Sequence, residues 1–95
     1  MIILGIDPGL TTTGFGILST KNDQTKIIDY GIIQPNRKDT LSNRLYSIYE
    51  DIEELIKTFS PNILSIEDIF YGRNVKSAFY LGQARGVAML CAAKH

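Results

Sequence analysis

The spacing of apolar residues divides the chain into strand-like and helix-like segments. Residues 1–6 are apolar apart from one glycine, which predicts a central strand covered on both faces. Residues 13–19 alternate between larger and smaller side chains, a polar turn follows at 21–24, and residues 26–33 indicate a returning strand. We expect these three segments to form an antiparallel meander.

A helix, a fourth strand and a second helix follow. Apolar residues recur every three or four positions across 40–58, which predicts an amphipathic helix whose acidic residues, Glu53 among them, face outward. Glu53 is also placed to pair with Lys57 one turn later. Residues 63–69 indicate a short apolar strand, and residues from 74 to at least 93 a second helix. Because a strand reached through a helix is usually parallel to an earlier one, this order predicts an α/β layer fold with a mixed sheet.

Small residues recur in two of these segments. Gly14 and Gly16 lie on one side of the second strand and leave room for backbone or a ligand to approach closely. Ala78, Gly82 and Gly86 recur every fourth residue in the second helix. They form a smooth stripe that permits close packing against another element.

Two strands end in a carboxylate, at Asp7 and at Glu67. If these strands are parallel neighbours, both acids emerge at the carboxyl-terminal edge of the sheet, where open α/β sheets bind ligands. Two carboxylates that converge repel each other unless a cation or a proton lies between them. Magnesium accepts one or two protein carboxylates and fills its other positions with water and phosphate oxygens. A pair of such ions can clamp both oxygens of a phosphodiester displacement, so the pattern favours metal-dependent phosphodiester hydrolysis.

Other interpretations of the same residues stay open. Asp7 alone, in Asp-Pro-Gly, is typical of a turn. Glu67 is harder to explain in this way, because it lies beside Asp68 inside an apolar run and a lone buried carboxylate is costly. A strand followed by Asp-x-Gly and residues 11–13, all threonine, also resembles the phosphate-binding hairpin of the actin-like and sugar-kinase-like ATP-binding fold. Neither the lysine-bearing phosphate loop nor the dinucleotide fingerprint occurs.

An aromatic and basic stretch follows Glu67. Phe70 precedes Arg73, Asn74 and Lys76 in a loop that enters the second helix. An exposed aromatic ring beside cations can stack on an unpaired base while the cations hold phosphates, which predicts DNA binding. The alternative is that the ring caps the core and the cations are only solvated.

Composition narrows the classes of protein further. The chain has 95 residues, of which 44% are hydrophobic and 21% charged, and its formal net charge is zero. It therefore has no overall basic field, and any nucleic-acid surface must be a local cluster of cations. The single Cys91 excludes an internal disulfide and leads us to expect a reducing cytoplasm. The apolar runs are too short to span a bilayer, and no targeting pattern precedes the first strand.

Several motifs together resemble the RuvC family of Holliday-junction resolvases. They are GIDPG, TGFG, IEDIF, Asn74 and LGQARGVA, and their order and spacing extend the resemblance over the whole chain. The resemblance implies an RNase H-like fold with a five-stranded sheet. It also implies a homodimeric endonuclease that cuts four-way DNA junctions with Mg²⁺ in recombination and repair, alongside the partners RuvA and RuvB. A YqgF-like nuclease is a second RNase H-like alternative, and a DNA-binding module without chemistry is a third.

The resemblance also assigns roles to individual residues. Asp7 and Glu67 correspond to two of four acidic catalytic metal ligands, and Phe70 to the aromatic residue that engages the opened junction. The stretch that corresponds to the dimer interface contains Gly82, Gln83, Arg85 and Gly86. The remaining two acidic ligands would lie beyond His95, and the chain ends inside a helical pattern. We therefore expect residues 1–95 to be the N-terminal part of a single RNase H-like domain, truncated before the fifth strand, that binds Mg²⁺ weakly and does not cleave DNA alone.

Overall fold

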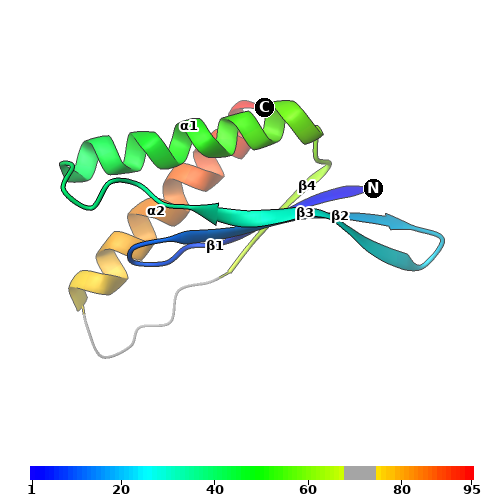
Figure 1. Cartoon of the computed structure of the whole chain (residues 1–95), viewed down its shortest axis with the longest axis horizontal. Coiled ribbons are helices and arrows are strands. Elements are labelled where there is room, and N and C mark those ends of the chain that lie inside the picture. Colours follow the sequence, from blue (N-terminus) through cyan, green and yellow to red (C-terminus); the bar gives the residue numbers. More distant parts are fainter. Residues whose placement is uncertain (68–74) are drawn as a thin grey trace.

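A computed structural model describes residues 1–67 and 75–95 of the chain, which form a four-stranded sheet and two helices (Figure 1). The strand order is β3-β2-β1-β4. The elements are β1 (Ile2–Asp7), β2 (Thr13–Lys21), β3 (Gln24–Ile33), α1 (Leu41–Phe59), β4 (Ile63–Ile66) and α2 (Val75–Lys94). All six predicted elements are present in the predicted order.

The sheet is mixed, as the sequence predicts. β1 pairs with β2 and β2 with β3 in antiparallel fashion, while β4 lies parallel to β1. The register between the parallel pair aligns Ile6 with Ile66. Consequently the residues that follow these two, Asp7 and Glu67, leave the sheet at the same edge.

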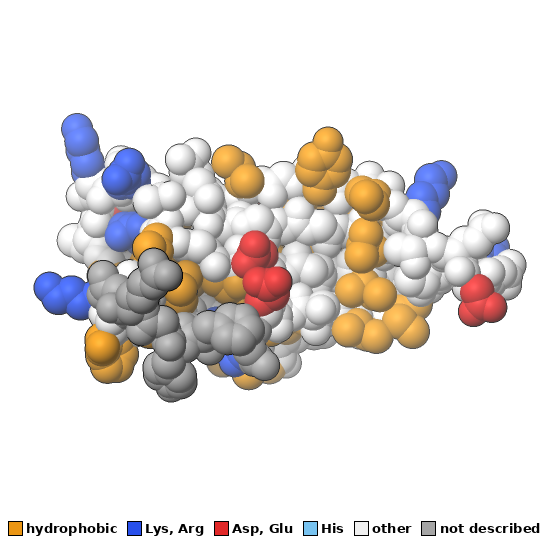
Figure 2. All heavy atoms as spheres, turned by 90° about the horizontal axis from the view of Figure 1, so that it is seen from below, with side chains coloured by type: hydrophobic (Ala, Val, Ile, Leu, Met, Phe, Trp, Pro, Cys, Tyr) orange, Lys and Arg blue, Asp and Glu red, His pale blue; other side chains and the backbone are white. Residues whose placement is uncertain are grey.

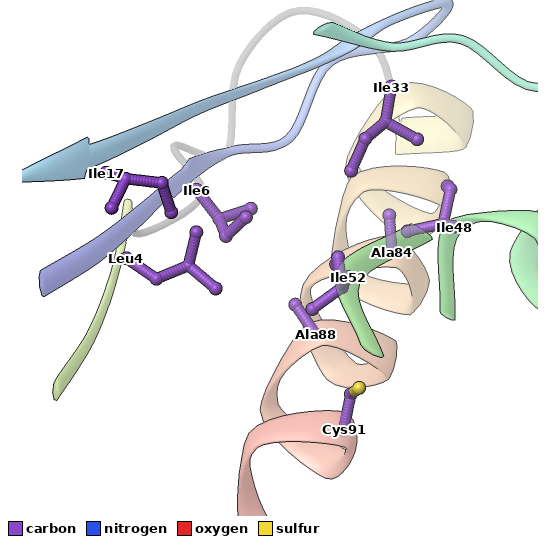
Figure 3. Packing of buried hydrophobic residues seen from close by; sticks show 9 residues of the cluster. All are labelled: Leu4, Ile6, Ile17, Ile33, Ile48, Ile52, Ala84, Ala88 and Cys91. Atoms are coloured by element: carbon purple, nitrogen blue, oxygen red, sulfur yellow. The ribbon is translucent and has the colours of Figure 1, made fainter. Parts of the chain in front are cut away.

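Both helices cover one face of the sheet, and the core lies between the helices and that face (Figure 3). The buried residues come from β1, β2, β3, α1 and α2: Leu4, Ile6, Ile17, Ile33, Ile48, Ile52, Ala84, Ala88 and Cys91. Alanines on α2 let the two helices approach closely at the positions where α1 contributes isoleucines. The apolar side of α1 thus packs against both the sheet and α2.

The prediction that β1 is covered on both faces is wrong for the described residues. Among residues 1–67 and 75–95, no helix lies over the second face, which we call the open face (Figure 1). Tyr30 and Ile32 of β3 are 76% and 62% exposed on it, and Ile63 of β4 is also exposed. A continuous apolar run does not show whether one face or both faces of its strand are covered. Successive side chains point to opposite faces, and in such a run the side chains on both faces are apolar in either case.

Local chemistry sets the ends of the elements. Thr40 caps α1, its hydroxyl accepting a hydrogen bond from the Asn43 amide at 3.3 Å, and Ser60 ends the helix in the left-handed conformation. Asn22 and Asp23 both have positive φ and form the tight turn between β2 and β3. Each boundary lies within a few residues of its predicted position, which is the usual uncertainty of helix and strand ends.

Glu53 does not face outward as predicted but lies half-buried between the two helices. It pairs with Lys57 at 3.6 Å, as expected, and also with Lys94 at 3.2 Å and His95 at 2.8 Å. Hydrogen bonds from His95 and Lys94 lower the pKa of Glu53 to about 2. The cluster ties together the carboxyl-terminal ends of α1 and α2. Neither helix, in the part of the chain that the structure describes, is long and apolar enough to cross a membrane.

Candidate active site

Asp7 and Glu67 lie side by side at the carboxyl-terminal ends of β1 and β4. The Glu67 amide donates to the Ile6 carbonyl oxygen at 3.4 Å, which continues the parallel ladder up to the two acids. Since side chains alternate along a strand, the burial of Leu4 and Ile6 beneath the helices places Asp7 on the open face. Glu67 is exposed rather than buried, and Asp68, the neighbouring acid, lies outside the described residues.

The two carboxyl groups interact directly. A hydrogen bond with Asp7, followed by repulsion from its charge, raises the pKa of Glu67 above the ordinary glutamate value. Two ionised carboxylates at this separation are mutually destabilising, and either a shared proton or a cation relieves the repulsion. The pair therefore has the electrostatic character of a cation site.

A shallow depression of about 410 Å³ on the open face contains both acids. Its lining comprises Gly5, Ile6, Asp7, Gly14, Phe15, Gly16, Leu18, Gly31, Ser65 and Glu67. Acidic side chains lie at the middle of this face in Figure 2. A Cβ atom added to Gly16 would meet no atom within 4 Å, so the space above that glycine is open. The glycines leave room beside the acids, in agreement with the pattern of small residues in the sequence.

The loop that follows Asp7 is held by two features. A Cβ atom on Gly9 would collide with the carbonyl oxygen of Thr12, so this tight loop requires glycine. From α1, Arg44 donates through Nη2 to the Leu10 carbonyl oxygen at 3.2 Å. The same nitrogen lies 3.3 Å from the Tyr80 hydroxyl, and the guanidinium lies over the Tyr80 ring at 4.8 Å.

Sequence reasoning missed Arg44. The available signal was its position one residue before Leu45 and four before Ile48, on the side of the helix that turns toward the core. A cation at such a position must find partners inside the fold, since its charge is costly to bury unpaired. In the structure the Leu10 carbonyl and Tyr80 supply them.

The remaining predicted site residues fall into three groups. Phe70, Arg73 and Asn74 lie outside the described residues. Lys76 is exposed in the first turn of α2. Among the four residues assigned to the dimer interface, Gly82, Gln83 and Gly86 are exposed on α2, whereas Arg85 turns toward the sheet and donates through Nε to the Glu67 carbonyl oxygen at 3.2 Å.

The geometry also bears on the nucleotide-binding alternative. Thr13 is 1% exposed and belongs to the buried side of β2, under the helices. Its hydroxyl is therefore not on the open face with Asp7. A phosphate beside Asp7 would have to be held without Thr13.

Within residues 1–67 and 75–95, no group of three or more His, Cys, Asp or Glu side chains is placed to hold a metal ion. Two carboxylates in contact fit one edge of the coordination shell of a hard cation such as Mg²⁺, which uses one or two protein carboxylates. The donor set thus fits part of a magnesium site.

A family model described as crossover junction endodeoxyribonuclease RuvC matches residues 3–95. The chain belongs to the RuvC family. Curated relatives that carry this description include proteins from Alkaliphilus oremlandii, 43% identical over 95 residues, and Petrotoga mobilis, 42% identical over 94 residues. The chain spans about 58% of the length of each of these RuvC relatives.

Solved structures show the RNase H-like fold. "T. thermophilus RuvC in complex with Holliday junction substrate" superposes with a TM-score of 0.90 at 22% identity, covering 99% of this chain and 60% of that chain. "Thermus thermophilus RuvC structure" gives a TM-score of 0.87. The Aquifex aeolicus PPX-GPPA enzyme, at 16% identity, gives 0.62 over 94% of this chain but only 33% of its own. Membership of the RuvC family does not favour the YqgF-like or ATP-binding alternatives.

Proposed function

We propose that the chain is the N-terminal part of a single RNase H-like nuclease domain, and that the intact protein cuts four-way DNA junctions during recombination and repair in the cytoplasm. The observation that carries this proposal is the convergence of Asp7 and Glu67 on the open face of the sheet. RuvC membership supplies the substrate class, since a relative of the same fold is described in complex with a Holliday junction.

The residues of this chain would act by holding and positioning. Asp7 and Glu67 would hold Mg²⁺, and the loop and strand that carry them are held by Arg44 at the Leu10 carbonyl and by Arg85 at the Glu67 carbonyl. A bound magnesium ion would lower the pKa of a coordinated water and neutralise charge on the phosphate. The glycines of the depression leave room for the phosphodiester. The products would carry a 5′-phosphate and a 3′-hydroxyl.

Two carboxylates form only part of such a site. We infer that the other acidic ligands belong to the portion of the RuvC relatives that this chain does not match. Residues 1–95 should then bind Mg²⁺ weakly and leave DNA uncut.

DNA recognition and assembly complete the proposal. The DNA-contacting residues would be Phe70, Arg73, Asn74 and Lys76. The exposed surface of α2, with Gly82, Gln83 and Gly86, would meet a second copy of the chain, and Arg85 would lie at the margin of that interface. RuvA and RuvB would be its partners at the junction.

The cation site can be tested on the chain itself with paramagnetic Mn²⁺ in place of Mg²⁺. In an NMR titration, Mn²⁺ should broaden the amide signals of residues 7, 14 and 67 first, and Asp7→Asn should remove that broadening. Asp23→Asn, at the distant hairpin turn, is the matched control and should leave it unchanged. Broadening that persists in Asp7→Asn, or that begins elsewhere, would refute the site.

A further inference from the structure

We propose that Arg37 and Lys38, in the loop between β3 and α1, bind phosphates of duplex DNA that reaches the Asp7–Glu67 site. This inference rests on the proposed function and extends its DNA-binding surface to a loop for which the family motifs give no role. Four observations support it: the position of the loop, its rigidity, the absence of ion pairs at its tip, and the charge balance of the molecule.

The topology brings this loop to the same end of the sheet as the two acids. β3 runs in the same direction as β1, because each is antiparallel to β2. Residue 33 and Asp7 therefore lie at the same edge, two strand spacings or about 10 Å apart. Four further residues of extended chain to Arg37, or five to Lys38, add at most about 18 Å. The tip of the loop is thus at most roughly 28 Å from the acids, a span of several phosphates at about 3.4 Å of rise per nucleotide.

The loop is anchored rather than free. Ile33 and Pro35 are buried on either side of Gln34. The Asn36 side chain accepts a hydrogen bond from the Lys38 amide at 3.0 Å, and its carbonyl oxygen accepts one from the Asp39 amide at 3.1 Å. Such an Asx turn fixes the backbone, so binding at Arg37 and Lys38 would cost little ordering of the loop.

The two cations have no ion-pair partner among residues 1–67 and 75–95, and both are exposed. At the far end of the helices, in contrast, Lys57 and Lys94 are both paired with Glu53. In Figure 2 Lys and Arg side chains gather at the left end of the open face, beyond the acidic side chains at its middle. Asp39 is the one acidic residue of the loop, and the first turn of α1 after it contains no acid that would oppose an anion.

The zero net charge of the chain explains why local cations would be needed for DNA binding. A chain with zero net charge has no long-range attraction for DNA, and two carboxylates at the site repel phosphates. Cations beside the site would offset that repulsion locally. Duplex DNA is the partner that matches this arrangement, because it presents phosphates at regular spacing alongside the one at the site.

The test measures binding of a fluorescently labelled four-way junction by the 95-residue chain, without divalent metal, from 50 to 200 mM salt. Arg37→Gln and Lys38→Gln should each weaken binding and reduce the slope of log affinity against log salt by about 0.9. The ratio of wild-type to variant affinity should then shrink about threefold for each lost contact over this salt range. Lys21→Gln and Lys26→Gln, at the opposite hairpin end, make the same charge change and should leave the slope unchanged.

Each other outcome overturns the inference. Equal losses in all four variants would mean that only net charge matters. Unchanged binding in the two loop variants would exclude the loop from the DNA surface while leaving the proposed nuclease function intact. A chain that binds no junction DNA would refute the loop contact, and the Mn²⁺ titration at Asp7 would then judge the nuclease proposal separately.

Discussion

At the scale of single residues, the contact between Asp7 and Glu67 makes folding stability depend on pH. The pKa of Glu67 in the folded chain is raised above the ordinary value of 4.5, mainly by its hydrogen bond with Asp7. At a pH between the ordinary and the raised pKa, Glu67 therefore keeps its proton in the folded state and has released it in the unfolded state. The stabilisation from this proton is present below the ordinary glutamate pKa and is lost as the pH rises through the raised value.

Asp7→Asn should therefore raise the free energy of unfolding at neutral pH and flatten its decline above the ordinary glutamate pKa. Denaturant unfolding of wild type and variant between pH 4 and 8 measures both effects. Asp23→Asn, which removes an equal charge from the exposed turn, should reproduce neither. If Asp7→Asn were less stable than wild type at neutral pH, the carboxylate would be serving the fold rather than a ligand.

A second prediction at the residue scale distinguishes a glycine that leaves space beside the acids from a glycine that the fold requires. Gly16→Ala should leave folding unchanged or stabilise it by about 0.5–1 kcal/mol, because glycine is unfavourable within a strand and the new Cβ meets no atom within 4 Å. It should nevertheless weaken Mn²⁺ binding, since the methyl group enters the depression beside the acids. Gly9→Ala should do the reverse and destabilise the chain, as its Cβ would strike the Thr12 carbonyl. Denaturation midpoints and the NMR titration distinguish the two effects.

At the scale of elements, α1 stabilises the loop after β1 through Arg44. Arg44→Ala removes the bonds to the Leu10 carbonyl and the Tyr80 hydroxyl. Because the bond to Leu10 is exposed, we expect a loss of about 1 kcal/mol, or about fivefold faster hydrogen exchange in the loop of residues 8–12. Tyr80→Phe keeps the ring beneath the guanidinium and should have a smaller effect. Exchange that stays at the wild-type rate in Arg44→Ala would show that the loop holds its shape without α1.

The elements themselves were predictable because each has a strong local pattern. The three- and four-residue spacing of α1 and the small turn at residues 22–23 define their elements without reference to the rest of the chain. Which face of β1 is covered was not predictable, since coverage depends on where both helices pack. Glu53 illustrates the same limit: its helical position was clear, but its contact partners Lys94 and His95 lie 41 and 42 residues later in the chain.

The candidate site likewise has one part that the sequence predicted and another that it could not predict. The meeting of Asp7 and Glu67 followed from one inference, that β1 and β4 are parallel neighbours, which the register confirms. Their roles as metal ligands stay predictions. Arg85 shows what a motif cannot convey, because its sequence context suggested an interface and gave no sign that its guanidinium contacts the end of β4. Long-range side-chain contacts of this kind depend on the packed structure.

At the scale of the whole molecule, α2 has an apolar face on each side. Ala84, Ala88 and Cys91 face the core, while Phe79 and Leu90 are 69% and 66% exposed. A helix that is apolar on both sides is usually buried on both, so we expect the outer face of α2 to meet the proposed second copy. The exposed Gly82 and Gly86 between these two side chains would allow a second helix to approach closely.

Phe79→Glu should therefore disrupt the proposed dimer. A charge placed on the outer face of α2 would have to be buried between two copies, and loss of a central aromatic contact typically costs 2 kcal/mol or more, which is about a 30-fold weaker dimer. Sedimentation equilibrium of the chain over a range of concentrations measures the dissociation constant. Tyr46→Glu is the matched control, since Tyr46 is 61% exposed on α1 and its replacement adds the same charge away from that face. Equal weakening in both variants, or a wild-type chain that stays monomeric at every concentration, would mean that the outer face of α2 does not pair two copies of this chain.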